Sequence, residues 1–234
     1  LLDADPAWSA PPSLRAVLVG GAPFPEPFRQ RALARQVPAL ATYGCTEACS
    51  QVATQGPSEI GRPGSGRPLP GIQVRIERGE IQVRGNVLMD GYLGEERSAD
   101  TWAEGGWLRT GDQGRFLPDG QLQVLGRLDD LIVSGGENVS PLEVEAWLLT
   151  VSGVSSACVF GIPDPDWGQA VAAALVVDPD RFDFAILCEA IREGLAAHKR
   201  PKGIAILDEL PLNRSGKVDR ARVLSVASAR LRSV

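Results

Sequence analysis

The segment LPLNRSGKVDR, residues 210–220, places Lys217 directly after a serine and a glycine. A Gly-Lys pair indicates a cation that could meet a phosphate group. The full G-x-x-x-x-G-K-[ST] spacing of a phosphate-binding P-loop is absent, however, because Val218 follows the lysine. Taken by itself, the segment is therefore more typical of a solvated lysine in a surface turn.

Three other polar motifs could also contribute to a site. They are TYGCTE at 42–47, GWLRTGD at 106–112 and GRLDD at 126–130. Each also has a purely structural interpretation: a turn at the end of a strand, a loop and a charged linker, respectively. Motifs this short are weak indicators of function one at a time, so their order along the chain matters more than any one of them.

The residue types that ligate zinc are few and scattered. The chain has four cysteines and a single histidine, His198. No pair of cysteines has C-x-x-C spacing, and the sequence therefore predicts no zinc site. We expect reduced, partly buried thiols of a cytoplasmic protein at Cys45, Cys49, Cys158 and Cys188.

Bulk composition narrows the class of protein. The 234 residues are 44% hydrophobic and 23% charged, which is typical of a globular chain of one or two domains. A net charge of −5 argues against a general nucleic-acid-binding surface, because there is no basic excess to displace counterions. No apolar run approaches the roughly 20 residues of a membrane span, so neither a span nor a signal peptide is predicted.

Residues 1–62 are expected to form an α/β layer. Ala16–Val19 is a continuous apolar run that predicts a buried parallel strand. Pro25 stands near the start of a predicted amphipathic helix, and PALATYG at 38–44 predicts a second buried strand. Polar residues at the ends of such strands commonly face a ligand crevice.

From residue 63 to residue 128 the pattern changes to hairpins. IQVRI (72–76) and EIQVR (80–84) alternate on either side of Arg78-Gly79, and Pro118-Asp119-Gly120 separates two further strands. This region predicts a small antiparallel sheet or barrel.

Residues 129–234 are expected to form a compact α+β domain. Ser140 is a good N-cap, Pro141 suits the first helical position, and Glu143 would complete an S-x-x-E capping box. VSSACVFGIPD and AVAAALVV predict strands. A later helix is predicted to carry one apolar face, made of Phe184, Leu187, Cys188, Ile191 and Leu195.

Taken in order, these motifs resemble the adenylate-forming superfamily, which contains acyl-CoA synthetases, luciferases and amino-acid adenylation domains. The resemblance runs from about Arg15 to Arg222. It implies that residues 1–128 are the end of a large AMP-binding domain, and that residues 129–234 are a small, mobile C-terminal domain. The matching motifs are GGAP, TYGCTE, GEIQVRG, GWLRTGD, GRLDDLIVSGGENVSPLEVE, GIPDPDWGQ and LPLNRSGKVDR.

The resemblance also implies a reaction in two steps. A carboxylate attacks the α-phosphate of Mg-ATP to give an acyl-adenylate and pyrophosphate, and a thiol, usually that of coenzyme A, then displaces AMP. Cations and hydrogen-bond donors are needed because the two reacting anions repel each other. The implied substrates and cofactors are a small-molecule carboxylic acid, ATP, Mg²⁺ and coenzyme A.

Roles for individual residues follow from the matching motifs alone. Thr46 would bond phosphate oxygens during catalysis, and Glu47 would help to hold Mg²⁺. Asp112 would accept hydrogen bonds from the ribose hydroxyls, and Arg127 would contact the ribose or a phosphate. The adenine and acyl pockets, where glycine permits close approach, would be lined by Gly20, Gly21, Ala22, Pro23, Thr42, Tyr43 and Gly44.

Lys217 matches the family lysine that bridges the substrate carboxylate and the adenylate oxygens in the first step, a task that suits a compact ammonium group. Asp129 falls at the family's hinge between the large and small domains, although it could also be an acid that flanks a helix. Rotation at this hinge would withdraw Lys217. It would bring Ser134, Gly135 and Gly136 beside the tunnel for the pantetheine arm.

The chain lacks one motif of the superfamily. The Gly/Ser/Thr-rich phosphate loop with its lysine is nowhere in the sequence, and the first residue is not methionine. We therefore expect the C-terminal portion of a longer enzyme, either a fragment or half of a split protein, with little or no activity by itself. The N-terminal portion is its expected partner, and the α/β layer is expected to have an exposed sheet edge. Gln169 also stands where the family usually has glutamate.

The segment TYGCTEACSQVAT, residues 42–54, bears on the identity of the acid. It resembles the o-succinylbenzoate-CoA ligases of menaquinone biosynthesis, whose substrate is an aromatic keto acid with two carboxylates. Ser50, Gln51 and Thr54 could supply hydrogen-bond donors to that acid, although Ser50 and Gln51 could simply cap a turn. Another aryl or acyl-CoA ligase, a non-catalytic adenylate-binding module and a homodimer all stay open.

Overall fold

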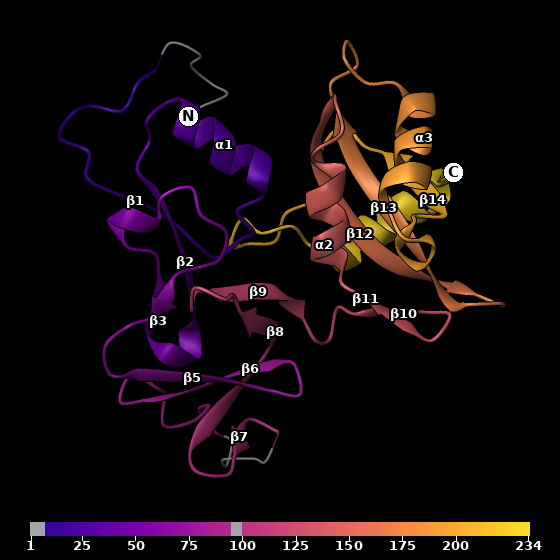
Figure 1. The fold of residues 1–234 in the computed structure, drawn as a ribbon. Coiled ribbons are helices and arrows are strands. Elements are labelled where there is room, and N and C mark those ends of the chain that lie inside the picture. The colour runs from indigo at the N-terminus through magenta and orange to yellow at the C-terminus, as the bar shows by residue number, and fades with distance from the viewer. Residues whose placement is uncertain (1–7, 95–99) are drawn as a thin grey trace. The chain divides into compact units, whose positions relative to one another are not determined.

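The computed structural model describes residues 8–94 and 100–234. The chain divides into two compact units, Leu1–Leu128 and Asp129–Val234, and each has its own sheets and hydrophobic core (Figure 1). The first unit combines an α/β layer with an antiparallel sheet, and the second is an α+β unit, which agrees with the predicted fold class. Among the described residues, no helix is long and apolar enough to cross a membrane.

The first sheet of unit one has the strand order β1-β2-β3-β4. β1 (Val17–Val19) runs parallel to β2 (Ala39–Cys45), and helix α1 (Glu26–Ala34) connects them, so the predicted strand-helix-strand unit is confirmed. β3 (Ser50–Thr54) and β4 (Arg67–Pro68) complete the sheet by antiparallel pairing.

The prediction that the first strand is buried is wrong. Leu18 is 53% exposed, and Val17 and Val19 are only half-buried. In the described part of the chain, β1 pairs with β2 alone, and an apolar run cannot by itself distinguish an edge strand from a central one. β1 is therefore the exposed sheet edge that was expected in this layer.

A tight corner at Gly44 leads from β2 to β3. The strand register shifts between Tyr43 and Gly44, and a Cβ atom on Gly44 would lie 1.6 Å from the carbonyl oxygen of Ser50. The short 3-10 helix Thr46–Ala48 follows, and Cys49 then turns the chain with a φ of 54°. Only glycine permits this close approach, so the corner fixes Thr46 and its neighbours at the end of β2.

The second sheet of unit one is antiparallel, with the order β5-β6-β8-β7 and with β9 also paired to β8. Arg78 and Gly79 have φ values of 53° and 84°, the geometry of a two-residue hairpin turn, which confirms the predicted hairpin. The strands are β5 (Ile72–Glu77), β6 (Glu80–Gly85), β7 (Trp102–Ala103), β8 (Trp107–Phe116) and β9 (Leu122–Arg127).

The two sheets of unit one share a hydrophobic core. Val52 and Ala53 of β3 pack with Ile81 and Val83 of β6 and with Leu122 of β9, and all five are fully buried. Burial of each larger side chain contributes roughly 1.5–3 kcal/mol. This core holds the first sheet against β6 and β9.

Unit two is built on a sheet with the order β11-β10-β13-β14-β15 and with β12 also paired to β13. Its strands are β10 (Ile132–Ser134), β11 (Glu137–Val139), β12 (Val154–Asp164), β13 (Gly168–Val177), β14 (Gly203–Ile206) and β15 (Arg232–Ser233). Its α-helices are α2 (Pro141–Leu148), α3 (Phe184–Gly194) and α4 (Arg220–Ala227).

Helices cover both faces of this sheet. Successive residues of β13 enter two different cores, because side chains alternate along a strand. Val171, Ala173 and Leu175 pack with residues of α2 and α3, whereas Ala172 and Ala174 pack with residues of α4. β13 is therefore buried on both sides, which explains its unbroken apolar sequence.

The predicted apolar face of helix α3 is confirmed. Leu187, Cys188, Ile191 and Leu195 are buried, and Phe184 packs on the same cluster. The helix begins with a cap that the sequence analysis did not identify. The Asp183 side chain accepts hydrogen bonds from the backbone N–H groups of Ala185 and Ile186, at 2.7 and 3.2 Å.

The capping box predicted for helix α2 is not formed. Ser140 and Pro141 do occupy the N-cap and first helical positions, but the Ser140 side chain makes no capping hydrogen bond. The Glu143 carboxylate instead accepts a hydrogen bond from Lys199 Nζ at 2.5 Å. Glu143 therefore pairs with Lys199, which is distant in the sequence, instead of capping helix α2.

Candidate functional site

Tyr43, at the end of β2, reaches from the first sheet of unit one to the second. Its hydroxyl donates to Oδ2 of Asp112 at 2.7 Å, and the residue is 8% exposed. Burial, and then the negative charge of Asp112, holds the pKa of Tyr43 well above its ordinary value. The hydroxyl therefore stays protonated and remains a donor to Asp112.

Asp112 lies in a bulge of β8. The register against β6 shifts so that three residues of β8, Thr110–Asp112, stand opposite the single residue Ile81. The Thr110 hydroxyl donates to the Ile81 carbonyl at 2.7 Å and accepts from the Asp112 N–H at 3.1 Å. Bulges of this kind re-aim side chains, and this one leaves the Asp112 side chain 16% exposed.

Arg127 closes the bulge from β9. Its guanidinium donates to the Thr110 carbonyl at 2.8 Å and pairs with Oδ1 of Asp112 at 3.3 Å. Gly111 has a φ of 68°, and a Cβ atom there would lie 2.8 Å from the guanidinium, so the bulge requires glycine. Asp112 thus has one oxygen bonded to Tyr43 and the other to Arg127.

Glu47 lies in the 3-10 helix after β2, and its Oε1 accepts from the Tyr92 hydroxyl at 2.8 Å. Burial acts to raise the pKa of Glu47. Hydrogen bonds from its own backbone N–H, Tyr92 and Cys45, together with the charge of Arg127, outweigh burial and lower that pKa. The carboxylate is therefore ionised at neutral pH, whereas burial raises the pKa of the Cys45 thiol to about 11.

This corner suits Mg²⁺ held partly by substrate phosphates. Glu47 and its exposed neighbour Thr46 offer hard oxygen atoms. Mg²⁺ in nucleotide sites is usually held by one or two carboxylates, phosphate oxygens and water, which fits such a set. The described residues contain no group of three or more side chains that could hold a metal ion without a substrate.

Gly20 and Thr42, two of the pocket residues implied by the resemblance, lie together at the middle of the first sheet. The hydroxyls of Thr42 and Thr54 are 2.9 Å apart across β2 and β3. Gly20 lies beside Thr42, since a Cβ atom on Gly20 would be 2.6 Å from Thr42 Cγ2. Gly21, Ala22 and Pro23 form the exposed connection that follows.

Ser50 and Gln51 lie at the other end of β3, opposite Cys45 and Gly44. Ser50 is exposed with a φ of 112°, and Gln51 is half-buried. Both residues therefore line the corner that carries Thr46, and Thr54 lies further along the same strand.

Lys217, in unit two, is exposed at the tip of a closed loop. The Asn213 side-chain oxygen accepts from three donors: the Ser215 N–H and hydroxyl, at 3.0 and 2.8 Å, and the Lys217 N–H at 3.0 Å. The Asn213 N–H donates to the Lys217 carbonyl at 2.7 Å, and Leu212 pairs with Val218. The loop is therefore ordered by its own polar groups.

Arg220 anchors the end of this loop inside unit two. Its guanidinium donates to Oε1 of Glu145 at 2.7 Å and to the Val159 carbonyl, and lies 3.6 Å from Oδ2 of Asp130. Burial acts to lower the pKa of Arg220, but the charge and hydrogen bond of Glu145, together with Cys158 and Asp130, outweigh burial and raise that pKa. The Lys217 loop is thus tied by ion pairs to the segment that opens unit two.

Gly135 and Gly136 form the turn between β10 and β11, and Ser134 is the last residue of β10. Ser134 is buried, and the Gly135 N–H donates to the Trp167 carbonyl at 3.0 Å. Gly135 has a φ of 60°, and a Cβ atom there would lie 2.5 Å from the Trp167 ring. Close packing of the indole therefore requires this glycine. Asp129 is the first residue of the unit.

The structure thus brings Tyr43, Glu47, Asp112 and Arg127 to one corner of unit one, and it places Lys217 on an ordered loop of unit two. Sequence reasoning missed three supporting side chains: Asn213, Arg220 and Glu80, whose carboxylate accepts a hydrogen bond from the Gly111 N–H of the bulge. The Asn-x-Ser spacing before Lys217 is a recognisable turn signal. No local pattern indicates the other two, because their partners are far away in the sequence.

Two family models match this chain. The model of the AMP-binding enzyme matches residues 1–93, and the model of the AMP-binding enzyme C-terminal domain matches residues 143–217. The chain belongs to the AMP-binding enzyme family. Both the TYGCTE segment and the Lys217 loop fall within the matched ranges.

Named relatives from this family resemble nearly the whole chain. A 2-succinylbenzoate–CoA ligase from Bacillus pumilus is 43% identical over 230 residues, covering 92% of this chain and 46% of the relative. The chain therefore spans about half the length of the curated relatives it matches.

Solved structures from the AMP-binding family have the same fold. The o-succinylbenzoate CoA synthetase MenE of Bacillus subtilis, in complex with the acyl-adenylate intermediate OSB-AMP, matches with a TM-score of 0.83 at 36% identity. That match covers 92% of this chain and 47% of MenE. The amide bond synthetase McbA of Marinactinospora thermotolerans matches with a TM-score of 0.84 at 35% identity, covering 91% of this chain and 47% of McbA.

Proposed function

We propose that this chain is the C-terminal part of an ATP-dependent acid-CoA ligase that acts through an acyl-adenylate. The observation that carries the proposal is the corner where Tyr43, Glu47, Asp112 and Arg127 meet at the ends of two sheets. The proposed acid is o-succinylbenzoate, supported by 43% identity to a 2-succinylbenzoate–CoA ligase. The proposed product is o-succinylbenzoyl-CoA.

In this proposal, unit one binds the nucleotide. Asp112 accepts hydrogen bonds from the ribose hydroxyls, and Arg127 contacts the ribose or a phosphate. Thr46 donates to phosphate oxygens, and Glu47 is the protein ligand of Mg²⁺, which neutralises phosphate charge when it is bound. The corner supports these roles because the carboxyl groups of Glu47 and Asp112 both lie near the Arg127 guanidinium.

The pocket residues have their own proposed roles. The adenine and acyl groups lie along Gly20–Pro23 and Thr42–Gly44, where Gly20 and Gly44 let neighbouring protein atoms approach more closely than a side chain would allow. Ser50, Gln51 and Thr54 are proposed to donate hydrogen bonds to the carboxylates of the acid. Their place along β3, which begins at the Gly44 corner, supports this role.

Unit two is proposed to serve both half-reactions. The Lys217 ammonium bridges the attacking carboxylate and the α-phosphate oxygens in the first step. Ser134, Gly135 and Gly136 serve the thiol in the second, and Asp129 is the hinge. The division of the chain into compact units between Leu128 and Asp129 supports a hinge at this position.

The remaining partners are also proposals. The N-terminal portion of the same enzyme would supply the phosphate loop, as the half-length match to the relatives supports. A homodimer is also proposed for the whole enzyme. A cytoplasmic location is supported by the four unpaired cysteines, since thiols stay reduced in that compartment.

A substrate panel tests the proposed acid. Acid-dependent pyrophosphate release would be measured with the intact gene product, ATP and Mg²⁺, comparing o-succinylbenzoate with benzoate, coumarate and hexanoate. We expect o-succinylbenzoate to have the highest kcat/KM. A higher value for any of the other three acids would rule out the assignment.

One alternative has a specific observation behind it. The amide bond synthetase McbA matches the fold as well as MenE does, so an amine is a second candidate for the acyl acceptor. Supplying the acyl-adenylate with either coenzyme A or a simple amine distinguishes the two. Thioester formation is expected, and amide formation alone would replace the ligase assignment with an amide synthetase.

A further inference from the structure

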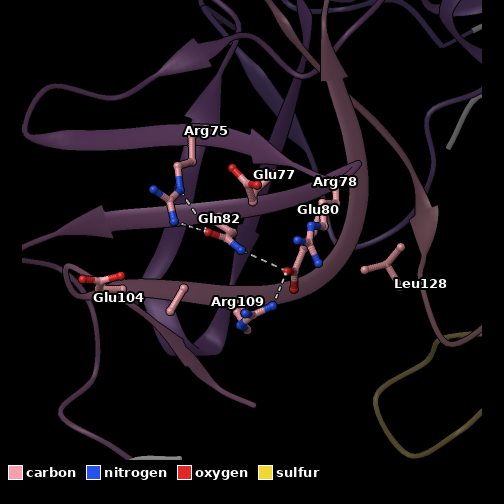
Figure 2. A pocket seen from close by; sticks show the side chains of 9 residues that line it. Arg75, Glu77, Arg78, Glu80, Gln82, Glu104, Arg109 and Leu128 are labelled. Carbon is pink, nitrogen blue, oxygen red and sulfur yellow. Dashed lines mark hydrogen bonds and ion pairs between the residues drawn. The ribbon is translucent and has the colours of Figure 1, made fainter. Parts of the chain in front are cut away.

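A chain of hydrogen-bonded polar side chains crosses the second sheet of unit one, and two of them, Glu80 and Gln82, are buried. It lines a cavity of about 470 Å³ between the β5–β6 hairpin and β8 (Figure 2). Arg75 donates twice to Oε1 of Gln82, at 3.0 and 2.8 Å. Gln82 donates in turn to Oε2 of Glu80 at 3.1 Å, and Arg109 lies 3.4 Å from the same oxygen. The chain of contacts therefore converges on the Glu80 carboxylate.

Glu80 is unusually buried for a glutamate, with 8% of its surface exposed, and its neighbour Gln82 is 1% exposed. A buried carboxylate is costly unless its oxygens are bonded. Oε2 meets this requirement within the cavity, through Gln82 and Arg109. Oε1 faces a different partner, and that partner belongs to the candidate site.

Oε1 of Glu80 accepts a hydrogen bond from the Gly111 N–H at 3.1 Å. Gly111 is the central residue of the bulge that presents Asp112. On its other side, the Gly111 carbonyl accepts from the Leu128 N–H at 2.8 Å, and Arg127 holds the neighbouring Thr110 carbonyl. β9 and the residue after it thus secure one side of the bulge, and the Glu80 carboxylate secures the other.

We propose that Glu80 is a positioning residue for ribose recognition: it fixes the Gly111 N–H and so holds the Asp112 carboxylate in place. This inference rests on the ribose role proposed above for Asp112. The effect of Glu80 passes through a short stretch of backbone, because Glu80 accepts a hydrogen bond from Gly111 and Asp112 is the next residue. Misplacing a binding group by about 1 Å can cost up to roughly 100-fold in activity, which makes such support functional.

Two substitutions of Glu80 separate the effect of its negative charge from the effect of its side-chain length. Glu80→Asp keeps the negative charge but shortens the side chain by one methylene, so its oxygen no longer reaches the Gly111 N–H. Glu80→Gln keeps the length and an acceptor oxygen for Gly111, but it loses the charge that faces Arg109. Glu77→Asp is the matched control, because Glu77 pairs with Glu80 across the hairpin and is exposed.

The experiment compares binding of a nucleotide whose ribose carries its 2′ and 3′ hydroxyls with binding of a nucleotide whose ribose lacks them. Dissociation constants of ATP and of 2′,3′-dideoxy-ATP would be measured by titration calorimetry on the intact gene product. In the wild type, the dissociation constant of 2′,3′-dideoxy-ATP should exceed that of ATP by roughly tenfold or more, because the dideoxy nucleotide lacks the hydroxyls that hydrogen-bond a charged group. The ratio of the two constants is compared among the variants. Glu80→Asp should bring the ratio close to one, whereas Glu80→Gln and Glu77→Asp should leave it near the wild-type value.

Thermal unfolding of the same variants separates positioning from general stability. Glu80→Gln should lower the melting temperature, because its amide faces the Gln82 and Arg109 donors, and yet it should keep the ratio. A wild-type ratio in folded Glu80→Asp would overturn the proposal. A lost ratio in folded Glu80→Gln would overturn it equally, and this second outcome is decisive even if Glu80→Asp does not fold.

Asp112→Asn distinguishes failure of this inference from failure of the proposed function. If Asp112→Asn reduces the ratio and Glu80→Asp does not, only the role of Glu80 is overturned. If the wild type shows no preference, or if Asp112→Asn leaves it unchanged, then Asp112 does not read the ribose, and both proposals fall together.

Discussion

Asp112 in unit one and Lys217 in unit two are held in place in opposite ways. Asp112 stands in a bulge whose backbone is hydrogen-bonded by side chains of two neighbouring strands. Its own carboxylate accepts a hydrogen bond from Tyr43 and pairs with Arg127. Lys217 stands on an exposed loop that is closed by Asn213, four residues earlier. The first arrangement fixes a side chain within its sheet, whereas the second orders the tip of a loop through the loop's own polar groups.

This difference matches the different demands of the proposed roles. A ribose must be bound throughout both half-reactions, so its acceptor gains from long-range support. A lysine proposed to serve only the first step needs a loop that keeps its shape without a fixed surface around it. The following variants test whether the two regions differ in this way.

The largest expected effect is that of Lys217→Ala. Removing a cation that meets developing negative charge commonly costs about 10²–10³-fold in rate, so acid-dependent pyrophosphate release should fall by that factor. Thioester formation from supplied acyl-adenylate should change little. Arg214→Ala, which removes an exposed cation from the same loop, is the matched control and should leave both rates near the wild type.

Equal losses in the two half-reactions would contradict the comparison, because Lys217 would then act throughout, as Asp112 is proposed to do. A comparable loss in Arg214→Ala would show instead that the loop contributes through its general positive charge.

The second effect in size is expected from Asp129→Pro. Proline fixes φ near −65° and constrains the preceding residue, so it should hinder a backbone rotation at this position. Thioester formation is expected to fall by roughly tenfold or more, since conformational steps often limit turnover. Adenylate formation should be largely spared, which is the reverse of the Lys217→Ala pattern.

Asp129→Ala is the control for loss of the carboxylate without stiffening, and it should behave like the wild type. If the proline and alanine variants lose the same activity, the side chain matters and the hinge does not. The two half-reactions would be measured separately in all these variants.

A third, smaller effect is expected from Asn213. Asn213→Ala removes the acceptor that bonds Ser215 and the Lys217 N–H, so the loop should lose order and adenylate formation should fall by about tenfold. Asn213→Asp keeps an acceptor oxygen in the same place and should restore most of the rate. The measurement is pyrophosphate release together with the melting temperature, which should hardly change because the loop is exposed.

If Asn213→Ala has no effect on adenylate formation, the loop does not need its internal bonds to present Lys217. If Asn213→Asp fails to restore activity, the Asn213 oxygen is not the group that matters. Either result would remove the contrast between a self-ordered loop and a supported bulge.

The parts of this fold that could be predicted are those set by local chemistry. The Arg78-Gly79 hairpin needed only a turn with positive φ between alternating strands, and the apolar face of α3 needed only its period. The burial of β1 was predicted wrongly, because burial depends on how many strands flank it. The Glu143 cap failed because Lys199, 56 residues away, competes for the acid.

The supporting side chains of the site could not be predicted for the same reason. Glu80 bonds Gly111 across 31 residues, and Arg220 bonds Glu145 across 75. Residue types at such separations carry no local signal, because any buried carboxylate could serve. The motifs indicated Asp112 and Lys217 themselves, and the structure added what holds each of them.

The smallest expected effect is that of Tyr92→Phe, which removes one donor from Glu47 in the supported corner. Because the folded pKa of Glu47 is lowered, its ionised form contributes stability that is present above the unfolded pKa, about 4.3. That contribution is lost as the pH falls through the folded pKa. Losing the Tyr92 hydroxyl should raise the folded pKa and reduce stability at pH 7 by less than about 1 kcal/mol, since the carboxylate is only half-buried.

The difference in melting temperature between Tyr92→Phe and the wild type should therefore be small at pH 7, and it should shrink as the pH falls and Glu47 becomes protonated in both proteins. A difference that does not depend on pH would mean that Tyr92 acts by packing and not through the carboxylate. A large loss at pH 7 would show that the corner depends on this single bond, and the supported region would then be no more robust than the Lys217 loop.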